Sequence, residues 1–592
     1  MSTNLRRGGM RRGTPGLRVR VGFLVIAFVL SVFGARLIQL QAVDPGAYAA
    51  MAAREGSVSI VLPASRGAIL DRNGQPLAQS AAGLMIVADP TMTAKNAPKL
   101  AAFLARRLGV DYFDTLALLR TKNSRFVYID RQVPSAQATA VVADADSHGW
   151  GGLFTNNDPL RVYPQKDVAA NVVGFLGTPN DDGSAHPLAG LEASFNRLLS
   201  GTDGSARYEV GAGNEIPLGD NTTTPAVDGA NLTTTLDANM QFYTQRVLQQ
   251  AVRGAAAKSG IAIVMDTRTG QLLAHADYPT YDASLPKEYK HSLYKSAALT
   301  DVYEPGSVEK TLTLSALMDA KPSIGPGTRL KVPGSIKVED RTIHDYWPHG
   351  LLDLTLAGVI AKSSNVGTVL ASSRLGASLM RHYLTQFGLG QRTNIGLTGE
   401  SPGILPTLGQ WTTGIKDRIA FGQSLSVNAL QEISAVNTIA NGGEYISPSL
   451  ILGSATTDNG QTVGSADATV RRVISAETAH KMTTMMEQVV KPSPIGVAPA
   501  AQVPGYVVAG KTGTAQEVGR SGLYDSTTVS FAGFAPADNP RFTIYVVIKS
   551  PRAGSGGGST AGPVFSKLMA HALARYGVAP TGAKPADTPV EW

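Results

Sequence analysis

The sequence contains no cysteine among its 592 residues. This absence excludes disulfide bonds, thiol catalysis and metal sites built from cysteine. Histidine is scarce as well, since the nine histidines are scattered and none falls in the H-E-x-x-H spacing of a zinc enzyme. We therefore expect neither a metal nor any other cofactor.

Acidic residues are missing from the start of the chain, and this absence explains part of the net charge of +8. Six arginines lie within the first 20 residues, before any acidic residue: Arg6, Arg7, Arg11, Arg12, Arg18 and Arg20. Because the excess of positive charge is local, it says little about nucleic acid, and we expect no nucleic-acid partner. It points instead to the cytoplasmic side of a membrane.

A long uncharged apolar run, 21–35, follows these arginines, and its apolar character continues past Arg36. A membrane-spanning helix needs about 20 residues, so we expect a single-pass anchor over 21–42. The basic tail 1–20 would then lie in the cytoplasm and the rest of the chain outside. The alternative is a cleaved signal peptide, for which Ala47-Tyr48-Ala49 offers a small-residue site well beyond the apolar run.

The remaining length is too great for one core and suggests two domains. Residues 43–230 show short strand patterns, such as 66–74 with its Asn-Gly turn, and no pairing of a nucleophile with a base. They indicate a non-catalytic, strand-rich pedestal. Residues 221–228 are typical of a linker. We assign 231–580 to a second domain and 581–592 to a C-terminal tail.

The second domain has strand patterns at both of its ends and helical patterns between them. The expected strands are 261–266, 272–276, 506–509, 528–534 and 542–548, and the expected helices include 356–360, 430–440 and 563–576. This order predicts an α/β (α+β) domain in which a mixed, mainly antiparallel five-stranded sheet lies between helices.

Ser307 is the candidate nucleophile of this domain. It follows a Pro-Gly break and opens an apolar helical pattern, in which positions i and i+3 share a face and bring its hydroxyl beside the amine of Lys310. A neutral amine can activate a serine, and burial favours the neutral form of lysine. The same Ser-x-x-Lys spacing at Ser284 and at Ser292 is better explained by solvated loops.

Two later segments complete a set of three motifs in this domain. Ser363 and Asn365 form a Ser-x-Asn element, and Lys511 begins a Lys-Thr-Gly element that occurs once in the chain. The three elements, in this order, are similar to the active-site set of penicillin-binding proteins and β-lactamases.

From about residue 20 to 577, the chain resembles the class B penicillin-binding proteins, the monofunctional D,D-transpeptidases that cross-link peptidoglycan. It looks most like their division (septal) branch. The landmarks of the pedestal are 66–74, 161–164 and 190–192. The resemblance implies a serine β-lactamase-like transpeptidase domain in the bacterial plasma membrane. It also implies four kinds of partner: peptidoglycan stem peptides, β-lactam antibiotics, a SEDS-family glycan polymerase and other division proteins.

The resemblance also assigns a role to each site residue. Ser307 would attack the penultimate D-alanyl carbonyl and release D-alanine, with Lys310 as the base. Ser363 would relay a proton to the leaving amine, and Asn365 would hold Lys310 and a substrate amide. The expected catalytic residues are Ser307, Lys310, Ser363, Asn365 and Lys511, and the expected substrate and oxyanion residues are Thr512, Gly513 and Thr514.

Glu309 departs from the family, whose members usually carry an apolar residue at this position. It lies about 200° around the helix from Ser307, so we expect it to point away from the Ser–Lys face. If it bent towards Lys310, it would favour the protonated amine and slow acylation. The chain would then be a non-enzymatic division scaffold with an impaired site.

Two further interpretations remain open. A β-lactamase or β-lactam sensor shares the three motifs, although the long pedestal and the lack of an evident deacylating carboxylate argue against it. The segment from Glu339 to His349 superficially resembles a glycosyltransferase motif, but it lies inside the transpeptidase-like domain. We expect it to be a loop of that domain.

Overall fold

A computed structural model describes residues 15–39, 57–122, 124–177, 185–211, 214–215, 221–339, 341–518, 524–552 and 554–592. Most of the predicted basic tail, the end of the predicted anchor and Ala47-Tyr48-Ala49 lie outside these residues. The chain divides into two compact units, one of Met1–Pro63 with Thr202–Val227 and one of Ala64–Gly201 with Asp228–Trp592.

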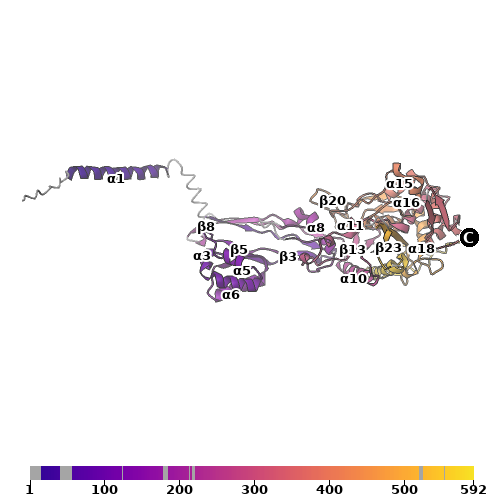
Figure 1. Ribbon diagram of the computed structural model, residues 1–592, viewed down its shortest axis with the longest axis horizontal. Helices are drawn as coiled ribbons and strands as arrows, with labels where there is room; N and C mark the ends of the chain where they lie inside the picture. Colours follow the sequence, from indigo (N-terminus) through magenta and orange to yellow (C-terminus); the bar gives the residue numbers. More distant parts are fainter. Residues whose placement is uncertain are drawn as a thin grey trace, which may run out of the picture. The chain divides into compact units, whose positions relative to one another are not determined.

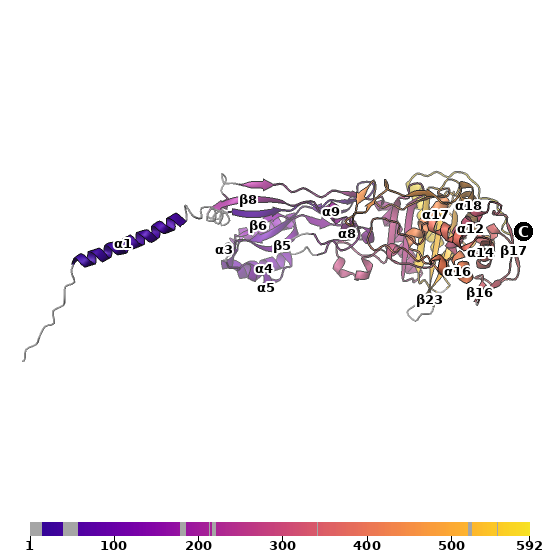
Figure 2. The same ribbon diagram turned by 90° about the horizontal axis from the view of Figure 1, so that it is seen from above.

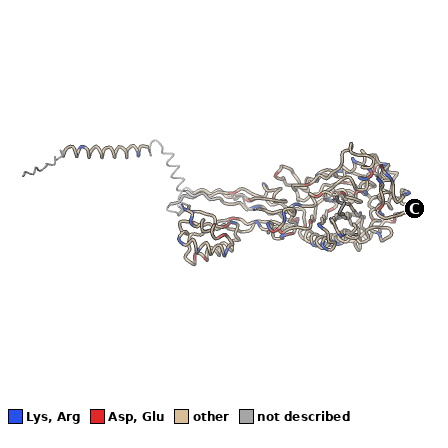
Figure 3. The backbone as a smooth tube through the Cα atoms, in the orientation of Figure 1, with Lys and Arg blue, Asp and Glu red and all other residues tan. Residues whose placement is uncertain are grey.

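The first unit contains a long apolar helix and a small antiparallel sheet. Helix α1 (Pro15–Ile38) includes Val19–Ile38, a stretch of mean hydropathy 2.4 that is long and apolar enough to cross a membrane. In Figure 3, α1 is drawn in the colour of uncharged residues along most of its length. This helix fits the predicted single-pass anchor.

The sheet of the first unit corrects the predicted linker. Strand β8 (Gly204–Gly211) pairs with β1 (Ser57–Leu62), with β9 (Asn214–Glu215) and with β10 (Thr222–Thr224). The threonines of β10 therefore belong to a strand, as expected for residues branched at Cβ.

The second unit begins with two small sheets and a group of helices. One sheet has the order β11-β2-β3-β7, with strands Leu232–Thr233, Ile69–Leu70, Pro76–Ala81 and Leu160–Val162. The other has the order β5-β4-β6, with strands Val127–Pro134, Gly83–Ala88 and Leu153–Asn157. The second sheet packs against α4 (Ala97–Leu108), α5 (Tyr112–Leu118) and α6 (Ser135–Ser147).

The pedestal landmarks of the sequence meet in one buried ionic cluster. The carboxylate of Glu192 accepts hydrogen bonds from Arg66 Nε at 2.6 Å and from Arg161 Nε at 2.7 Å. The hydroxyl of Tyr163 lies 3.3 Å from the same carboxylate. Because two arginines neutralise the buried acid, this cluster can join three distant segments of the chain.

The predicted five-stranded sheet is confirmed in the second unit. Its order is β13-β12-β24-β23-β22, with strands Leu272–Tyr278, Ser259–Asp266, Phe542–Lys549, Tyr524–Ala535 and Ala509–Val518. All four pairings are antiparallel. The strand predicted over 506–509 was misplaced, since β22 begins where that prediction ended.

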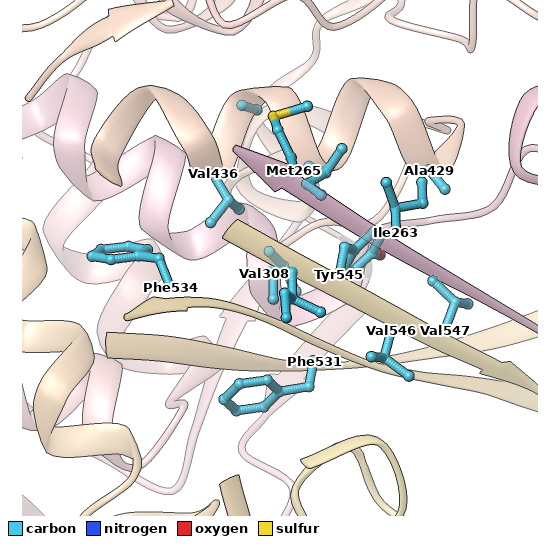
Figure 4. Close-up of a cluster of buried hydrophobic side chains, with 14 of the residues drawn as sticks. Ile263, Met265, Val308, Ala429, Val436, Phe531, Phe534, Tyr545, Val546 and Val547 are labelled. Carbon is cyan, nitrogen blue, oxygen red and sulfur yellow. The ribbon is translucent and has the colours of Figure 1, made fainter. Parts of the chain in front are cut away.

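Helices cover this sheet, as predicted, and the arrangement is visible in Figures 1 and 2. Helices α10 (Ala238–Gly254) and α19 (Gly562–Arg575) pack against it and against each other. Helix α17 (Ala429–Ala440) packs on β24, β23 and β12 and contacts α12 (Glu309–Ala320). Figure 4 shows side chains of α17 and of the central strands gathered around Val308, which immediately precedes α12.

The residues assigned to a C-terminal tail pack on the rest of the second unit. Val590 O accepts a hydrogen bond from Thr355 N at 3.1 Å, and Trp592 N donates to Asp353 O at 3.1 Å. These contacts place the end of the chain beside β17 (Leu352–Thr355), which pairs with β14 (Arg329–Val332).

Candidate active site

Ser307 lies in a tight turn between the sheet and α12. A single 3₁₀ turn, Gly306–Val308, carries it, and α12 begins two residues later. Gly306 has a φ of +58°, and a Cβ atom there would meet Thr514 O of β22 at 2.6 Å. Glycine is therefore required for this turn to lie against β22.

Lys310 is completely buried, one turn further along the chain from Ser307. Its Nζ donates hydrogen bonds to Ser363 O at 2.6 Å and to Asn365 Oδ1 at 2.7 Å. The Ser-x-x-Lys and Ser-x-Asn elements therefore meet in space, as the sequence predicted.

Lys511 of β22 also contacts Ser363. Its Nζ donates to Ser363 Oγ at 2.8 Å and lies 3.2 Å from Thr512 Oγ1. Lys310 Nζ is 3.4 Å from Ser363 Oγ on the other side. The Ser363 hydroxyl thus lies between the two amines, in a residue with a φ of +59°.

The two lysines are not equivalent. Burial lowers the pKa of Lys310 to about 7, although the nearby Asp345 carboxylate opposes the shift. Burial and the charge of Lys310 together lower the pKa of Lys511 well below its usual value. Repulsion between the two amines therefore lowers the pKa of Lys511, whereas burial alone lowers that of Lys310. A substantial fraction of Lys310 is neutral near pH 7 and can accept a proton.

Gly513 is required for close packing within the protein itself. A Cβ atom at Gly513 would meet Ser530 Oγ of β23 at 2.2 Å and Pro305 O at 2.9 Å. The glycine therefore lets β22 pack against its neighbours within the protein. Strand β22 is the last strand of the sheet order and therefore an edge strand.

The site opens into a cleft of about 810 Å³. Five of the expected site residues line it: Ser307, Ser363, Asn365, Thr512 and Thr514. Thr514 is exposed, whereas Lys310 and Lys511 are buried beneath the cleft. Ser284 and Ser292, by contrast, are exposed in or beside short 3₁₀ turns, which confirms the loop interpretation.

Glu309 turns away from the amine of Lys310. It is fully buried and faces Glu432 of α17, and burial followed by this second acid raises its pKa well above the usual value. Burial raises the pKa of Glu432 to about 8. Within the described residues, none of the four carboxyl oxygens has a hydrogen-bond partner. Both acids are therefore mainly neutral at pH 7, and Glu309 does not hold Lys310 in its charged form.

Asp345 was missed by the sequence analysis. Its carboxylate accepts hydrogen bonds from Ser364 Oγ at 2.6 Å and from Val366 N at 3.0 Å, and it lies 3.0 Å from His349 Nε2. The acid and the histidine belong to the segment interpreted as a loop, and their four-residue spacing was the available signal. The loop interpretation was wrong for Arg341–His344, which form strand β16.

Two family models match this chain. The penicillin binding protein transpeptidase domain matches residues 260–570, and the penicillin-binding protein dimerisation domain matches residues 61–234. The chain therefore belongs to the penicillin-binding proteins that carry a transpeptidase domain, as the sequence analysis indicated.

Known relatives match over nearly the whole chain. Penicillin-binding protein PbpB of Mycobacterium tuberculosis is 36% identical, over 96% of this chain and 86% of the relative. Peptidoglycan D,D-transpeptidase FtsI of Escherichia coli is 29% identical, over 95% of this chain and 92% of the relative. A crystal structure of penicillin-binding protein 3 from M. tuberculosis with aztreonam is 32% identical, with a TM-score of 0.68, and the match covers 90% of this chain and all of that one.

Proposed function

We propose that this protein is a membrane-anchored peptidoglycan D,D-transpeptidase that acts in septal wall synthesis through a Ser307 acyl-enzyme. One observation carries the proposal: the Ser363 hydroxyl lies between the amines of Lys310 and Lys511, beside the cleft that Ser307 lines. Relatives named peptidoglycan D,D-transpeptidase and a relative with bound aztreonam support it.

Acylation begins when Ser307 Oγ attacks the penultimate D-alanyl carbonyl of a stem peptide. Neutral Lys310 takes the hydroxyl proton, and the backbone N–H groups of Ser307 and Thr514 stabilise the oxyanion. The C–N bond then breaks, and the leaving D-alanine receives the proton from Lys310 through the Ser363 hydroxyl. An amine of a neighbouring stem peptide then attacks the acyl carbonyl and the ester bond to Ser307 breaks. The proton lost by the amine passes through Lys310 to Ser307 Oγ, which restores the hydroxyl and the neutral base.

Lys511 and the neighbouring hydroxyls bind the terminal carboxylate of the donor peptide. Thr512 and Thr514 present their side chains to the cleft, and Lys511 lies beneath Thr512. A bound carboxylate favours the protonated form of Lys511, which its buried position otherwise disfavours. The donor peptide would lie along the outer edge of β22 as an added strand.

The proposal includes an active site outside the cytoplasm. The six N-terminal arginines favour a cytoplasmic N-terminus, so the pedestal (43–230) and the transpeptidase domain (231–580) lie on the opposite side. The two matched domains are a dimerisation and a transpeptidase domain, so we assign glycan polymerisation to a SEDS-family partner that acts with other division proteins.

Intact-mass analysis tests the nucleophile. Full-length protein in detergent, incubated with benzylpenicillin, should gain one penicillin per chain, and Ser307→Ala should gain none. An adduct that forms and disappears within seconds would indicate a β-lactamase instead. Folded protein that gains no adduct would indicate the scaffold interpretation, because Ser307 would then not be a working nucleophile.

A further inference from the structure

We propose that Asp345 is a positioning residue for acylation: supported by His349, its carboxylate fixes the Ser363–Ser364–Asn365 turn and balances the charge of Lys310. This inference rests on the proposed function, because it assigns the parts of that site that hold Ser363 and Asn365 in place.

The Asp345 carboxylate is tied to both sides of Asn365. Its side chain has no exposed surface, and its two oxygens accept from Ser364 Oγ and from Val366 N, the residues before and after Asn365. Ser364 is also the N-cap of α14 (Asn365–Ser372), and its Oγ accepts from Gly367 N at 2.8 Å. An acid at the N-terminus of a helix is favoured by the helix dipole.

The residue before Asp345 orients the amide of Asn365. Asn365 Nδ2 donates to His344 O at 2.9 Å, so its Oδ1 faces Lys310 Nζ at 2.7 Å. The two consecutive residues His344 and Asp345 therefore hold both the backbone and the side chain of the Ser-x-Asn element. Ser363 needs such support, because its φ of +59° is rare for a residue other than glycine.

His349 supports the carboxylate from the other side. One ring nitrogen lies 3.0 Å from Asp345 Oδ2 and the other lies 2.7 Å from Gly350 O. Both ring nitrogens therefore lie within hydrogen-bonding distance of an oxygen atom. Only 6% of the His349 side chain is exposed, so the ring fills the space behind Asp345.

The charge of Asp345 affects the protonation of Lys310, the proposed base. Lys310 faces Lys511 from β22 and Asp345 from the segment after β16 (Arg341–His344), whereas Glu309 faces Glu432. Besides Lys310, Asp345 faces His349 and Tyr346. Because Asp345 opposes the effect of burial on Lys310, loss of its charge should lower the pKa of Lys310 further.

The test is the pH profile of acylation by benzylpenicillin, measured with full-length protein. Asp345→Asn should lower the second-order rate constant about 10- to 100-fold, as for other groups that orient a reacting side chain. It should also move the acidic limb of the profile to lower pH. Asp345→Glu keeps the negative charge but not the hydrogen-bond geometry. The acidic limb of its pH profile should therefore stay near that of the wild type, whereas its rate constant should stay low.

Three further variants keep the test decisive. Asp353→Asn removes an acid of β17 that is 44% exposed and pairs with Lys331, and it should change neither the rate constant nor the limb. His349→Gln and Ser364→Ala each remove one contact of Asp345, and each should lower the rate constant by less than Asp345→Asn does. If Asp345→Asn does not fold, these two variants test the positioning role of Asp345 in its place.

Two results would overturn the proposal while leaving the proposed function intact. The first is a folded Asp345→Asn protein whose acylation rate constant and acidic limb equal those of the wild type. If Asp345→Asn does not fold, the same result for both His349→Gln and Ser364→Ala would count equally. The second is an Asp345→Asn sample in which the number of penicillin-binding sites falls only in proportion to the amount of folded protein. The folded fraction would then show the acidic limb of the wild type. A wild-type protein that is never acylated would overturn the proposed function, and the role of Asp345 with it.

Discussion

The two sides of helix α12 hold buried acids in opposite kinds of surroundings. On the side of the cleft, Asp345 accepts hydrogen bonds from a hydroxyl and a backbone N–H and lies near Lys310. On the side of α17, Glu309 and Glu432 face each other without a hydrogen-bond partner among the described residues. Equally buried acids can therefore differ in their hydrogen-bond partners and in the charges beside them, and both factors affect how readily a buried acid ionises.

This difference helps Lys310 to remain neutral. A second carboxylate directed at Lys310 would favour its protonated form, and Glu309 avoids that outcome by packing against α17 as a neutral acid. The cleft side is thus expected to control the chemistry and the α17 side to control stability. The predictions below separate the two sides.

Removal of the base should have the largest effect. Lys310→Met should lower the rate constant of acylation by benzylpenicillin by about 1,000-fold, within the range for loss of general-base catalysis. Lys310→Arg should fail similarly, because a guanidinium stays protonated. Lys321→Met, at an exposed lysine just after α12, is the matched control and should acylate normally. A Lys310→Met protein within tenfold of the wild type would contradict this view of the cleft side.

The pH dependence of the wild type should show the next largest effect. Only neutral Lys310 accepts the Ser307 proton, and its pKa is about 7. The rate constant should therefore fall about tenfold for each pH unit below 7 and level off above it. Competition with a fluorescent penicillin between pH 5.5 and 8.5 measures this profile. A flat profile would mean that Lys310 is not the group that titrates.

The smallest effect is expected on the α17 side and concerns stability. The folded protein holds a proton on Glu432 with a pKa of about 8, above the ordinary value of 4.5. The stability that this group contributes to the folded state is complete below pH 4.5 and is lost as the pH rises through 8. Glu432→Gln should remove this loss, so its melting temperature should exceed that of the wild type most clearly at pH 8.5.

The exposed Glu477 of α18 (Ala476–Val489) provides the control for that measurement. Its side chain is 75% exposed, so Glu477→Gln should leave the pH dependence of the melting temperature unchanged. Neither glutamine variant should move the acidic limb of acylation. A shift of that limb in Glu432→Gln would show that the two sides of α12 are coupled.

The parts of the site that could be predicted from sequence are the local ones. Ser307, Lys310, Ser363 and Asn365 were found because short motifs fix their spacing, and the central strands were found because buried strands are continuous apolar runs. The start of β22 was misplaced, because the polar Lys-Thr-Gly element lies inside a strand instead of at its end.

The parts that could not be predicted depend on contacts between distant segments. Asp345 acts on Ser364 through a fold that brings the segment after β16 to the start of α14, and Glu309 meets Glu432 only because α12 packs on α17. Amphipathic helix α4 was missed for another reason. Its buried positions, including Leu100, Ala101 and Leu104, do repeat at helical spacing, but the surrounding strand signals dominated the interpretation.

The packed C-terminus has a practical consequence for handling this protein. Glu591 lies 3.0 Å from Lys362, the residue before Ser363, and the ring of Trp592 lies beneath Arg329 and Lys331. A purification tag or fluorescent fusion joined after Trp592 would lie beside β17 and could disturb its packing. Strand β17 leads through α13 (Leu356–Ala361) into the turn that carries Ser363. Labels for imaging or affinity capture are better joined at the opposite end of the chain.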